Sequence, residues 1–377
     1  MLFVIFLCVI AFLVSFRLGK SAFIINSLVF SVGFLFQYVI FLEYQFGWND
    51  EYFLSDELLY LTEYLGGDLD WESNTVRTRR FWFLVNKLIL LTGESMIAFK
   101  LINIPFLMIL NCYFYLLTGK NKLALLLPFV LPYLLFLSVT NLRDMLIFLS
   151  IFAVVYHALN RGVGHLLFML MYGFILFNLR PFSLFMVIGV LMLWLLYEAR
   201  KRINLTSVMH LSLLIVPLIY WLSPLIVNYY DSVVYYLAHR EVLREGHRGF
   251  GLLNIGEYLA RSIYAPFPTT LASMLMESDE HTGWGYTHDI VRFINQVSIM
   301  VISAMIIFKL VEVFLLGKKI VFELITRDSV ILALILLAHS VIYALYSAGA
   351  MHSRLHLFGN MFLFLLFLNI RSEKKER

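Results

Sequence analysis

Apolar runs of membrane-span length follow one another along almost the whole chain, and they constrain its fold more than any other feature. A helix needs roughly 20 apolar residues to cross the hydrocarbon of a bilayer, and about eleven runs approach that length. The runs are residues 1–16, 22–43, 96–118, 123–138, 145–160, 164–178, 182–198, 206–228, 291–314, 329–348 and 354–370. Hydrophobic residues make up 61% of the sequence and charged residues 14%, whereas roughly a quarter of a soluble domain is charged. We therefore predict an all-α polytopic membrane protein with one membrane domain over residues 1–377.

The links between these runs carry a charge asymmetry that predicts orientation. Lys and Arg gather in every second link, and positively charged links stay in the cytoplasm. The positive links are 17–20, 120–122, 160–161, 200–202, 318–327 and the tail 371–377. The outer links are then 44–95, 139–144, 179–181, 229–290 and 349–353. This pattern predicts an outer N-terminus, a cytoplasmic C-terminus and two large extracytoplasmic loops, 44–95 and 229–290. We interpret the net charge of +4 as a topology signal and expect no nucleic-acid partner.

The first outer loop, 44–95, places its acidic residues before its basic ones. Ser55, Asp56 and Glu57 precede leucines at helical spacing, as the N-cap and acidic first turn of a helix do. We expect this amphipathic helix to lie on the membrane surface, and Phe81–Leu91 to dip into the interface and return. Two interpretations of the carboxylates stay open: a pair that acts as a base or binds a metal, or a solvated helix cap.

Two short outer links combine an arginine with a second feature. Arg143 and Asp144 begin one apolar run, and Arg180 precedes Pro181 between two others. Charged groups at this depth are costly unless they face protein or water. The pair is therefore either a salt bridge that joins two helices or an arginine that binds an anion, with Asp144 holding it or acting as base. Arg143, Arg180 and Arg354 are expected at one membrane depth.

The long outer loop, 229–290, is rich in arginine. Arg240, Arg244 and Arg248 have the spacing of one helical face, with His247 among them. Guanidinium groups bind phosphate oxygens through paired hydrogen bonds, so this row suits a lipid-linked pyrophosphate. The alternative is a surface helix whose arginines pair with neighbouring glutamates or with anionic headgroups. The sequence has no Walker A, dinucleotide-binding or zinc-ligand motif, which argues against an ATP-driven pump and a zinc protease.

Several short motifs carry a resemblance to known families. They are Asp56–Tyr60, Asn141–Asp144, Leu179–Pro181, Pro266–Pro268 and Gly349 to Arg354. Together they resemble bacterial membrane glycosyltransferases of the GT-C class, and in particular the O-antigen and exopolysaccharide repeat-unit polymerases (Wzy-type and EpsG-like). The resemblance implies a GT-C-like fold in the bacterial inner membrane. It also implies a glycosyltransferase that polymerises undecaprenyl-pyrophosphate-linked repeat units of O-antigen or capsule at the periplasmic face.

The residues and the resemblance together define the expected site. Arginines hold the pyrophosphate, and a carboxylate or histidine accepts the proton of the acceptor hydroxyl. The expected substrate-binding residues are Arg143, Arg180, Arg240, Arg244, Arg248 and Arg354. The candidate bases are Asp144, Glu57 and His247. No cofactor or metal is expected, and the partners are a polyprenyl-linked oligosaccharide, the bilayer and a possible chain-length regulator.

Two alternatives stay open. One is a GT-C enzyme that transfers a single sugar from a polyprenyl-phosphate donor, with Asp56, Glu57 and Asp144 central and a divalent metal possible. The other is a flippase or transporter of lipid-linked oligosaccharides.

Overall fold

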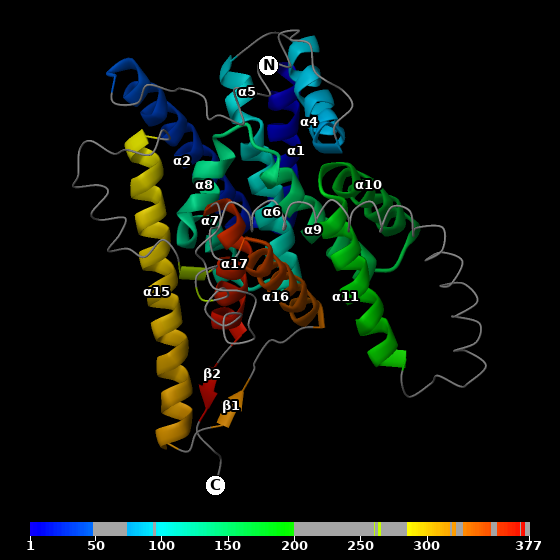
Figure 1. Ribbon diagram of the computed structural model, residues 1–377, viewed down its shortest axis with the longest axis vertical. Helices are drawn as coiled ribbons and strands as arrows, with labels where there is room; N and C mark the ends of the chain where they lie inside the picture. Colours follow the sequence, from blue (N-terminus) through cyan, green and yellow to red (C-terminus); the bar gives the residue numbers. More distant parts are fainter. Residues whose placement is uncertain are drawn as a thin grey trace, which may run out of the picture.

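The computed structural model describes residues 1–47, 74–92, 96–199, 260, 263–264, 285–316, 319–321, 327–347, 353–369 and 371–373. Almost all of these residues are helical, which confirms the all-α prediction (Figure 1). One short antiparallel pairing joins β1 (Lys319–Val321) to β2 (Arg371–Glu373). The two termini lie at opposite ends of the molecule (Figure 1).

The helices occur in the order of the apolar runs. In the first part of the chain they are α1 (Leu2–Leu18), α2 (Lys20–Gln45), α4 (Asn74–Leu91), α5 (Met96–Leu101) and α6 (Asn103–Leu117). They continue with η1 (Lys122–Leu126), α7 (Leu127–Val130), α8 (Pro132–Ser138), α9 (Asp144–Leu159), α10 (Val163–Leu179) and α11 (Pro181–Ala199). The last are α15 (Gly285–Leu316), α16 (Arg327–Ser347) and α17 (Ser353–Asn369).

Within the part of the chain that the structure describes, four helical stretches are long and apolar enough to cross a membrane. They are Lys20–Gln45, Ile97–Leu117, Pro181–Glu198 and Tyr286–Glu312. The apolar helices Leu2–Leu18, Asp144–Leu159, Val163–Leu179, Asp328–Ile342 and His356–Asn369 are shorter. Large apolar side chains are exposed along α1, α2, α10, α11 and α15, where hydrocarbon would solvate them and water would not. These features indicate a membrane protein. The run 206–228 lies outside the described residues.

The run 123–138 is broken, so the prediction of one helix there was wrong. It forms η1, α7 and α8; Pro128 is the second residue of α7, and Pro132 is the first residue of α8. Proline lacks an N–H group and clashes with the preceding turn, so it begins a helix more readily than it continues one. All residues of α8 are buried. This segment is therefore an internal packing element.

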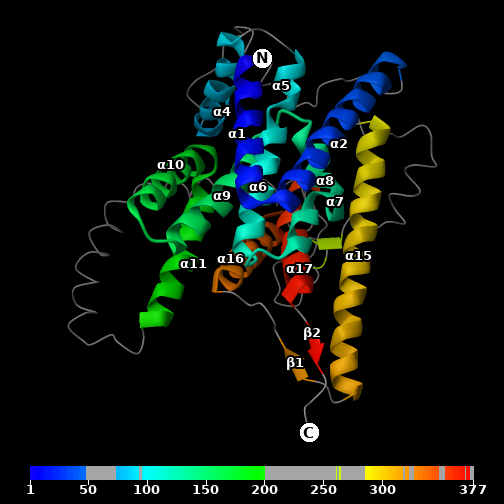
Figure 2. The same ribbon diagram turned by 180° about the vertical axis from the view of Figure 1, so that it is seen from behind.

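The core surrounds α6 and α9. Nearly every residue of both helices is buried. In both views α15 lies on one side of this centre, and α10 and α11 lie on the opposite side (Figures 1 and 2). α15 packs on α2, α8 and α17, whereas α11 packs on α9, α10 and α16. The short helix α8 thus lies between α15 and the central pair.

The expected bounds of the two large outer loops need correction. Within the first loop, α4 covers the segment Phe81–Leu91, whose dip into the interface stays a prediction, and its residues Trp82, Asn86 and Ile89 are fully buried in the protein. Helix α15 begins at Gly285, so the last residues of the predicted loop 229–290 are helical. Likewise α2 continues to Gln45, into the predicted loop 44–95. The expected surface helix at Ser55–Leu65 lies outside the described residues.

Candidate functional site

The link between α8 and α9, which carries Arg143 and Asp144, is held by buried amide side chains. Asn103, at the start of α6, donates hydrogen bonds from Nδ2 to the carbonyl oxygens of Thr140 at 2.6 Å and Leu142 at 2.7 Å. Asn103 is fully buried. Two short bonds from one rigid helix fix the link on both sides of residue 141. The residues of this predicted outer link are mostly buried, because these amides hold it inside the protein.

Asn141 is itself a residue of this link, and its side-chain hydrogen bonds also fix the position of the link. Its Nδ2 donates to the carbonyl oxygen of Phe99 at 2.6 Å and to Oδ1 of Asn86 at 2.9 Å. Its Oδ1 accepts from Nε1 of Trp82 at 2.8 Å and from Nδ2 of Asn86 at 3.2 Å. A buried amide with its donors and acceptor satisfied gives the backbone beside it a single conformation. The position of Arg143 and Asp144 is therefore defined by α4, α5 and α6.

Asp144 and Arg180 are brought together although they come from different links. The guanidinium Nη2 of Arg180 lies 3.6 Å from Oδ1 of Asp144. The Asp144 side chain is 4% exposed and that of Arg180 is 20% exposed. Arg143, half-buried, immediately precedes Asp144 at the N-cap of α9. The structure therefore brings one predicted arginine, Arg180, to the predicted carboxylate of Asp144, and Arg143 is the residue before Asp144 in the chain.

Helices α16 and α17 approach the same junction. His339, fully buried in α16, lies close enough to the Arg180 guanidinium for the two to interact electrostatically. Its ring lies 6.4 Å from that of Phe182 and stacks on Phe358 with centroids 4.6 Å apart. Its Nδ1 donates to the Ile335 carbonyl oxygen at 2.8 Å.

Phe358 is about one turn along α17 from Arg354, which stands in the first turn of that helix. Among the contacts of the residues that the structure describes, none places Arg354 beside Arg180, so the expected approach of these two arginines stays a prediction. We call Arg143, Asp144, Arg180 and His339 the junction site.

The remaining predicted site residues lie outside the described residues. These are Glu57, His247, Arg240, Arg244 and Arg248.

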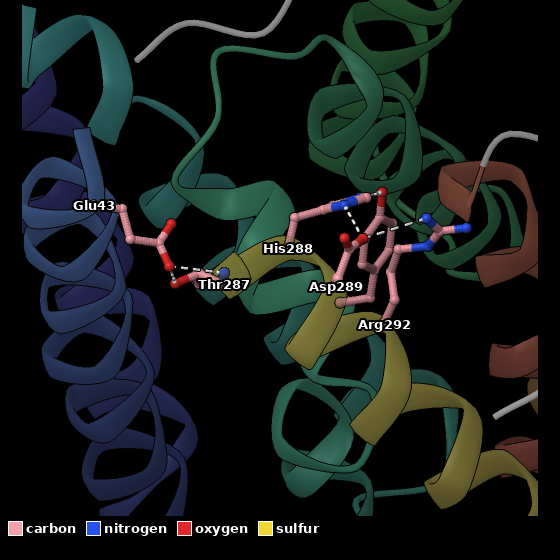
Figure 3. A network of polar contacts seen from close by, with 6 residues as sticks. Glu43, Thr287, His288, Asp289 and Arg292 are labelled. Atoms are coloured by element: carbon pink, nitrogen blue, oxygen red, sulfur yellow. Dashed lines mark hydrogen bonds and ion pairs between the residues drawn. The ribbon is translucent and has the colours of Figure 1, made fainter. Parts of the chain in front are cut away.

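A second polar group, which the sequence analysis did not single out, lies at the start of α15. Glu43, in the last turn of α2, accepts two hydrogen bonds at Oε1, from the backbone N–H of Thr287 at 2.8 Å and from its hydroxyl at 2.6 Å (Figure 3). Thr287 is in the first turn of α15. The carboxylate therefore satisfies an N–H group that the helix itself leaves without a partner, and it suits the positive end of the helix dipole.

The next residues of α15 extend this group. His288 Nδ1 lies 3.0 Å from Asp289 Oδ1, and Arg292 Nη1 lies 3.6 Å from the same oxygen (Figure 3). The hydroxyl of Tyr133, on α8, lies 3.4 Å from His288 Nε2. Glu43, His288 and Asp289 are each less than 5% exposed. We call Glu43, Tyr133, Thr287, His288, Asp289 and Arg292 the α15 cluster.

A signal in the sequence could have revealed part of this cluster. His288, Asp289 and Arg292 stand at the beginning of an apolar helix, and i, i+3 spacing places Asp289 and Arg292 on one face. These residues were instead predicted to belong to the outer loop 229–290, whose expected end lies two residues after His288. Glu43 gave no such signal, because its partner is 244 residues away.

Neither polar group has the composition of a metal centre. Across the stretches that the structure describes, no three His, Cys, Asp or Glu side chains are grouped so that they could hold a metal ion. The junction site is suited to bind an anion through guanidinium groups, and the α15 cluster presents both carboxylates and hydrogen-bond donors.

Comparison with protein-family models, with curated proteins and with solved structures found no match.

Proposed function

We propose that the chain is a membrane glycosyltransferase that polymerises repeat units carried on undecaprenyl pyrophosphate, with the junction site as its donor-binding site. The observation that carries the proposal is the approach of Arg180 to Asp144 within 3.6 Å, directly beside Arg143. An arginine inside an apolar helical protein is costly unless it serves a partner or a ligand. A diphosphate is a ligand that two adjacent guanidinium groups bind well, because each can form paired hydrogen bonds.

The reaction places specific demands on this site. The acceptor hydroxyl attacks the anomeric carbon of the donor sugar, the bond from that carbon to the pyrophosphate oxygen breaks, and the leaving pyrophosphate takes the electron pair. Arg143 and Arg180 stabilise the charge that develops on this leaving group. Asp144 holds Arg180 in position and is the candidate acceptor of the hydroxyl proton. No nucleotide is consumed.

The apolar exterior supports a polyprenyl substrate. Exposed apolar side chains run along α10 as far as Phe174 and along α11 from Ile188, so each series comes within about two turns of the junction between these helices. A polyprenyl chain could follow this surface while its pyrophosphate reaches Arg180. We further propose the bacterial inner membrane as the location, with the N-terminus outside and the C-terminus in the cytoplasm. The position of the two termini at opposite ends supports a topology of this kind (Figure 1).

The proposal is tested with purified protein in liposomes and lipid-linked repeat units isolated from the source cells. The expected result is a longer glycan without added ATP. Arg180→Lys keeps the charge but loses the planar fork, so kcat/KM should fall about tenfold or more. The matched control is Arg161→Lys, at an exposed position after α9, which should leave kcat/KM unchanged.

Other results would favour the alternatives. Addition of one sugar that stops in the presence of EDTA would indicate the single-sugar transferase. Movement of the lipid across the bilayer with unchanged glycan length would indicate a flippase. Full activity in Arg180→Lys would overturn the assignment of the junction site.

A further inference from the structure

Two histidines from neighbouring helices share a hydrogen bond at the closed end of the α9–α10 hairpin. His157 is in the last turn of α9 and His165 is in the first turn of α10, and their Nδ1 atoms lie 2.8 Å apart. A hydrogen bond between two ring nitrogens holds one proton, because one nitrogen donates and the other accepts. The contact therefore requires that at least one of the two Nδ1 atoms is unprotonated. We call these two residues the histidine pair.

The ring of His157 is held in place by its neighbours. It stacks on Phe168 of α10, with ring centroids 5.2 Å apart and an angle of 17° between the planes. Its Nε2 lies 2.8 Å from the hydroxyl oxygen of Tyr113, which belongs to α6. His157 is buried, whereas His165 is partly exposed. Protons from solution can therefore reach the pair through His165, while the His157 ring cannot turn away from a second proton.

The groups around the pair do not compensate a second positive charge. In the described part of the chain, no carboxylate, lysine or arginine side chain bonds to either imidazole. The titratable groups that the packed helices bring to this end are Tyr113 of α6, Tyr156 of α9 and Tyr172 of α10, which stay neutral near pH 7. Asp328, at the start of α16, acts electrostatically on Tyr156, and Arg161, in the link, is exposed. A doubly protonated pair would thus place N–H against N–H and bring two positive charges together.

The same two helices carry the ion pair of the junction site at their other end. Asp144 is the first residue of α9, about 20 Å along the helix from His157. Arg180 directly follows the last residue of α10. Helices α9 and α10 pack on each other, and packed helices move against each other as rigid elements. A change in their packing at the histidine pair therefore also changes the approach of Arg180 to Asp144.

We propose that the histidine pair is a proton-sensitive contact that closes the α9–α10 hairpin while one proton is shared, and that releases it when both Nδ1 atoms are protonated. Release shifts Arg180 relative to Asp144. This inference goes beyond the proposed function, because it concerns the hairpin whatever substrate the junction site binds. In the proposed topology this end of the hairpin faces the cytoplasm, so the contact responds to cytoplasmic acidification.

The sign and size of the effect follow from proton counting. Separate histidines take up protons near pH 6.5, so below that pH the released hairpin binds one proton more than the closed one. Acid therefore favours release, because the state that binds more protons gains stability as pH falls. The ratio of closed to released hairpin should fall about tenfold for each pH unit below 6.5, and thus about tenfold between pH 7.5 and pH 5.5.

The test measures hydrogen–deuterium exchange of the full-length protein in nanodiscs at pH 7.5 and pH 5.5, with each rate corrected for intrinsic exchange. In the wild type, protection of residues 156–168 and 176–186 should be about tenfold lower at pH 5.5. In His165→Asn it should differ by less than about twofold, because the amide takes the place of Nδ1 and can donate to His157 or accept from it. The internal control is the α1–α2 turn at residues 12–25, which contains no histidine and should keep its protection at both pH values.

The other outcomes would overturn the inference. An equal acid effect in the wild type and in His165→Asn would assign it to other groups, and unchanged protection of the wild type at pH 5.5 would refute a proton-sensitive contact. A loss confined to residues 156–168 would refute the transmission to Arg180. Should His165→Asn fail to fold, His165→Gln supplies the same amide without a titratable group. None of these measurements depends on glycan lengthening, so a protein that lengthens no glycan but shows the expected exchange would support the contact and refute the polymerase.

Discussion

Replacement of Asn103 by leucine tests whether the buried amides position the junction site. The substitution keeps the approximate shape of the side chain and removes its hydrogen-bonding groups. Two bonds are lost, to the carbonyl oxygens of Thr140 at 2.6 Å and Leu142 at 2.7 Å. Both carbonyl groups belong to buried residues of the link that carries Arg143 and Asp144.

The size of the effect follows from these contacts. Each carbonyl left without its donor costs about 1–3 kcal/mol, so the two together cost about 2–6 kcal/mol. An opposing contribution comes from Oδ1 of Asn103, which is buried without a hydrogen bond, and its removal recovers about 1–3 kcal/mol. The free energy of unfolding should therefore fall by about 1–3 kcal/mol. Glycan-lengthening activity should fall further than the loss of folded protein explains, because the link holds Arg143 and Asp144.

The assay is unfolding in mixed detergent micelles, followed by tryptophan fluorescence, with the activity of the same preparation measured in liposomes. Asn178→Leu is the matched control. Its amide donates one hydrogen bond, at 2.8 Å, to the carbonyl four residues earlier in its own helix at an exposed position, so stability should change by less than about 0.5 kcal/mol. An Asn103→Leu protein as stable and active as the wild type would refute the role assigned to these amides.

Three further predictions concern contacts between helices. Asp144→Asn and Arg180→Gln should each lower the free energy of unfolding. The double variant should lose less than the sum of the two single losses, with a coupling energy of about 0.5–3 kcal/mol in a double-mutant cycle. Strict additivity would mean that the 3.6 Å approach of the two side chains contributes nothing to stability. Gly359→Ala should lower the melting temperature, because its Cβ would lie 2.8 Å from an isoleucine carbon and 2.9 Å from a serine oxygen. The control Gly189→Ala, where nothing lies within 4 Å, should leave the melting temperature unchanged or raise it, and an equal decrease in both variants would contradict the packing argument. Asn26→Leu should lower the free energy of unfolding by about 1–3 kcal/mol. The Asn26 amide joins α1, α2 and α6, because it donates a hydrogen bond to a serine oxygen at 2.7 Å and accepts one from an asparagine at 3.0 Å. An unchanged unfolding curve would show that this network has no net effect on stability.

The sequence predicted the elements better than their interruptions and ends. The runs at α1, α2, α9, α10, α11, α16 and α17 correspond to helices within a few residues of the expected bounds. It failed where the average apolarity of a run concealed a local break, as at Pro128 and Pro132. It also failed at the start of α15, where polar residues suggested a loop but Thr287, His288 and Asp289 are buried in a helix.

The junction site was partly predictable. Arg143, Asp144 and Arg180 were selected because charged groups at the ends of apolar runs need a partner, and the structure brings Asp144 and Arg180 together. The order of residues could not reveal that Asp144 pairs with Arg180, which belongs to the link between α10 and α11. Asn103 was not selected, and Asn141 was named only as part of the motif Asn141–Asp144, because an asparagine within or beside an apolar run carries no sign of which backbone it will bind. The same is true of Glu43.

The sequence by itself determined that this chain is a helical protein with an apolar exterior, because the transfer of a segment into hydrocarbon depends on the residues of that segment alone. Only the tertiary structure decided which polar groups share a site. Hydrogen bonds and ion pairs require atoms within about 3–4 Å, and that distance is set by how the helices pack. For this reason Glu43 contacts Thr287, which lies 244 residues away in the sequence. The amides that position the link carrying Asp144 also contact residues that are distant in the sequence.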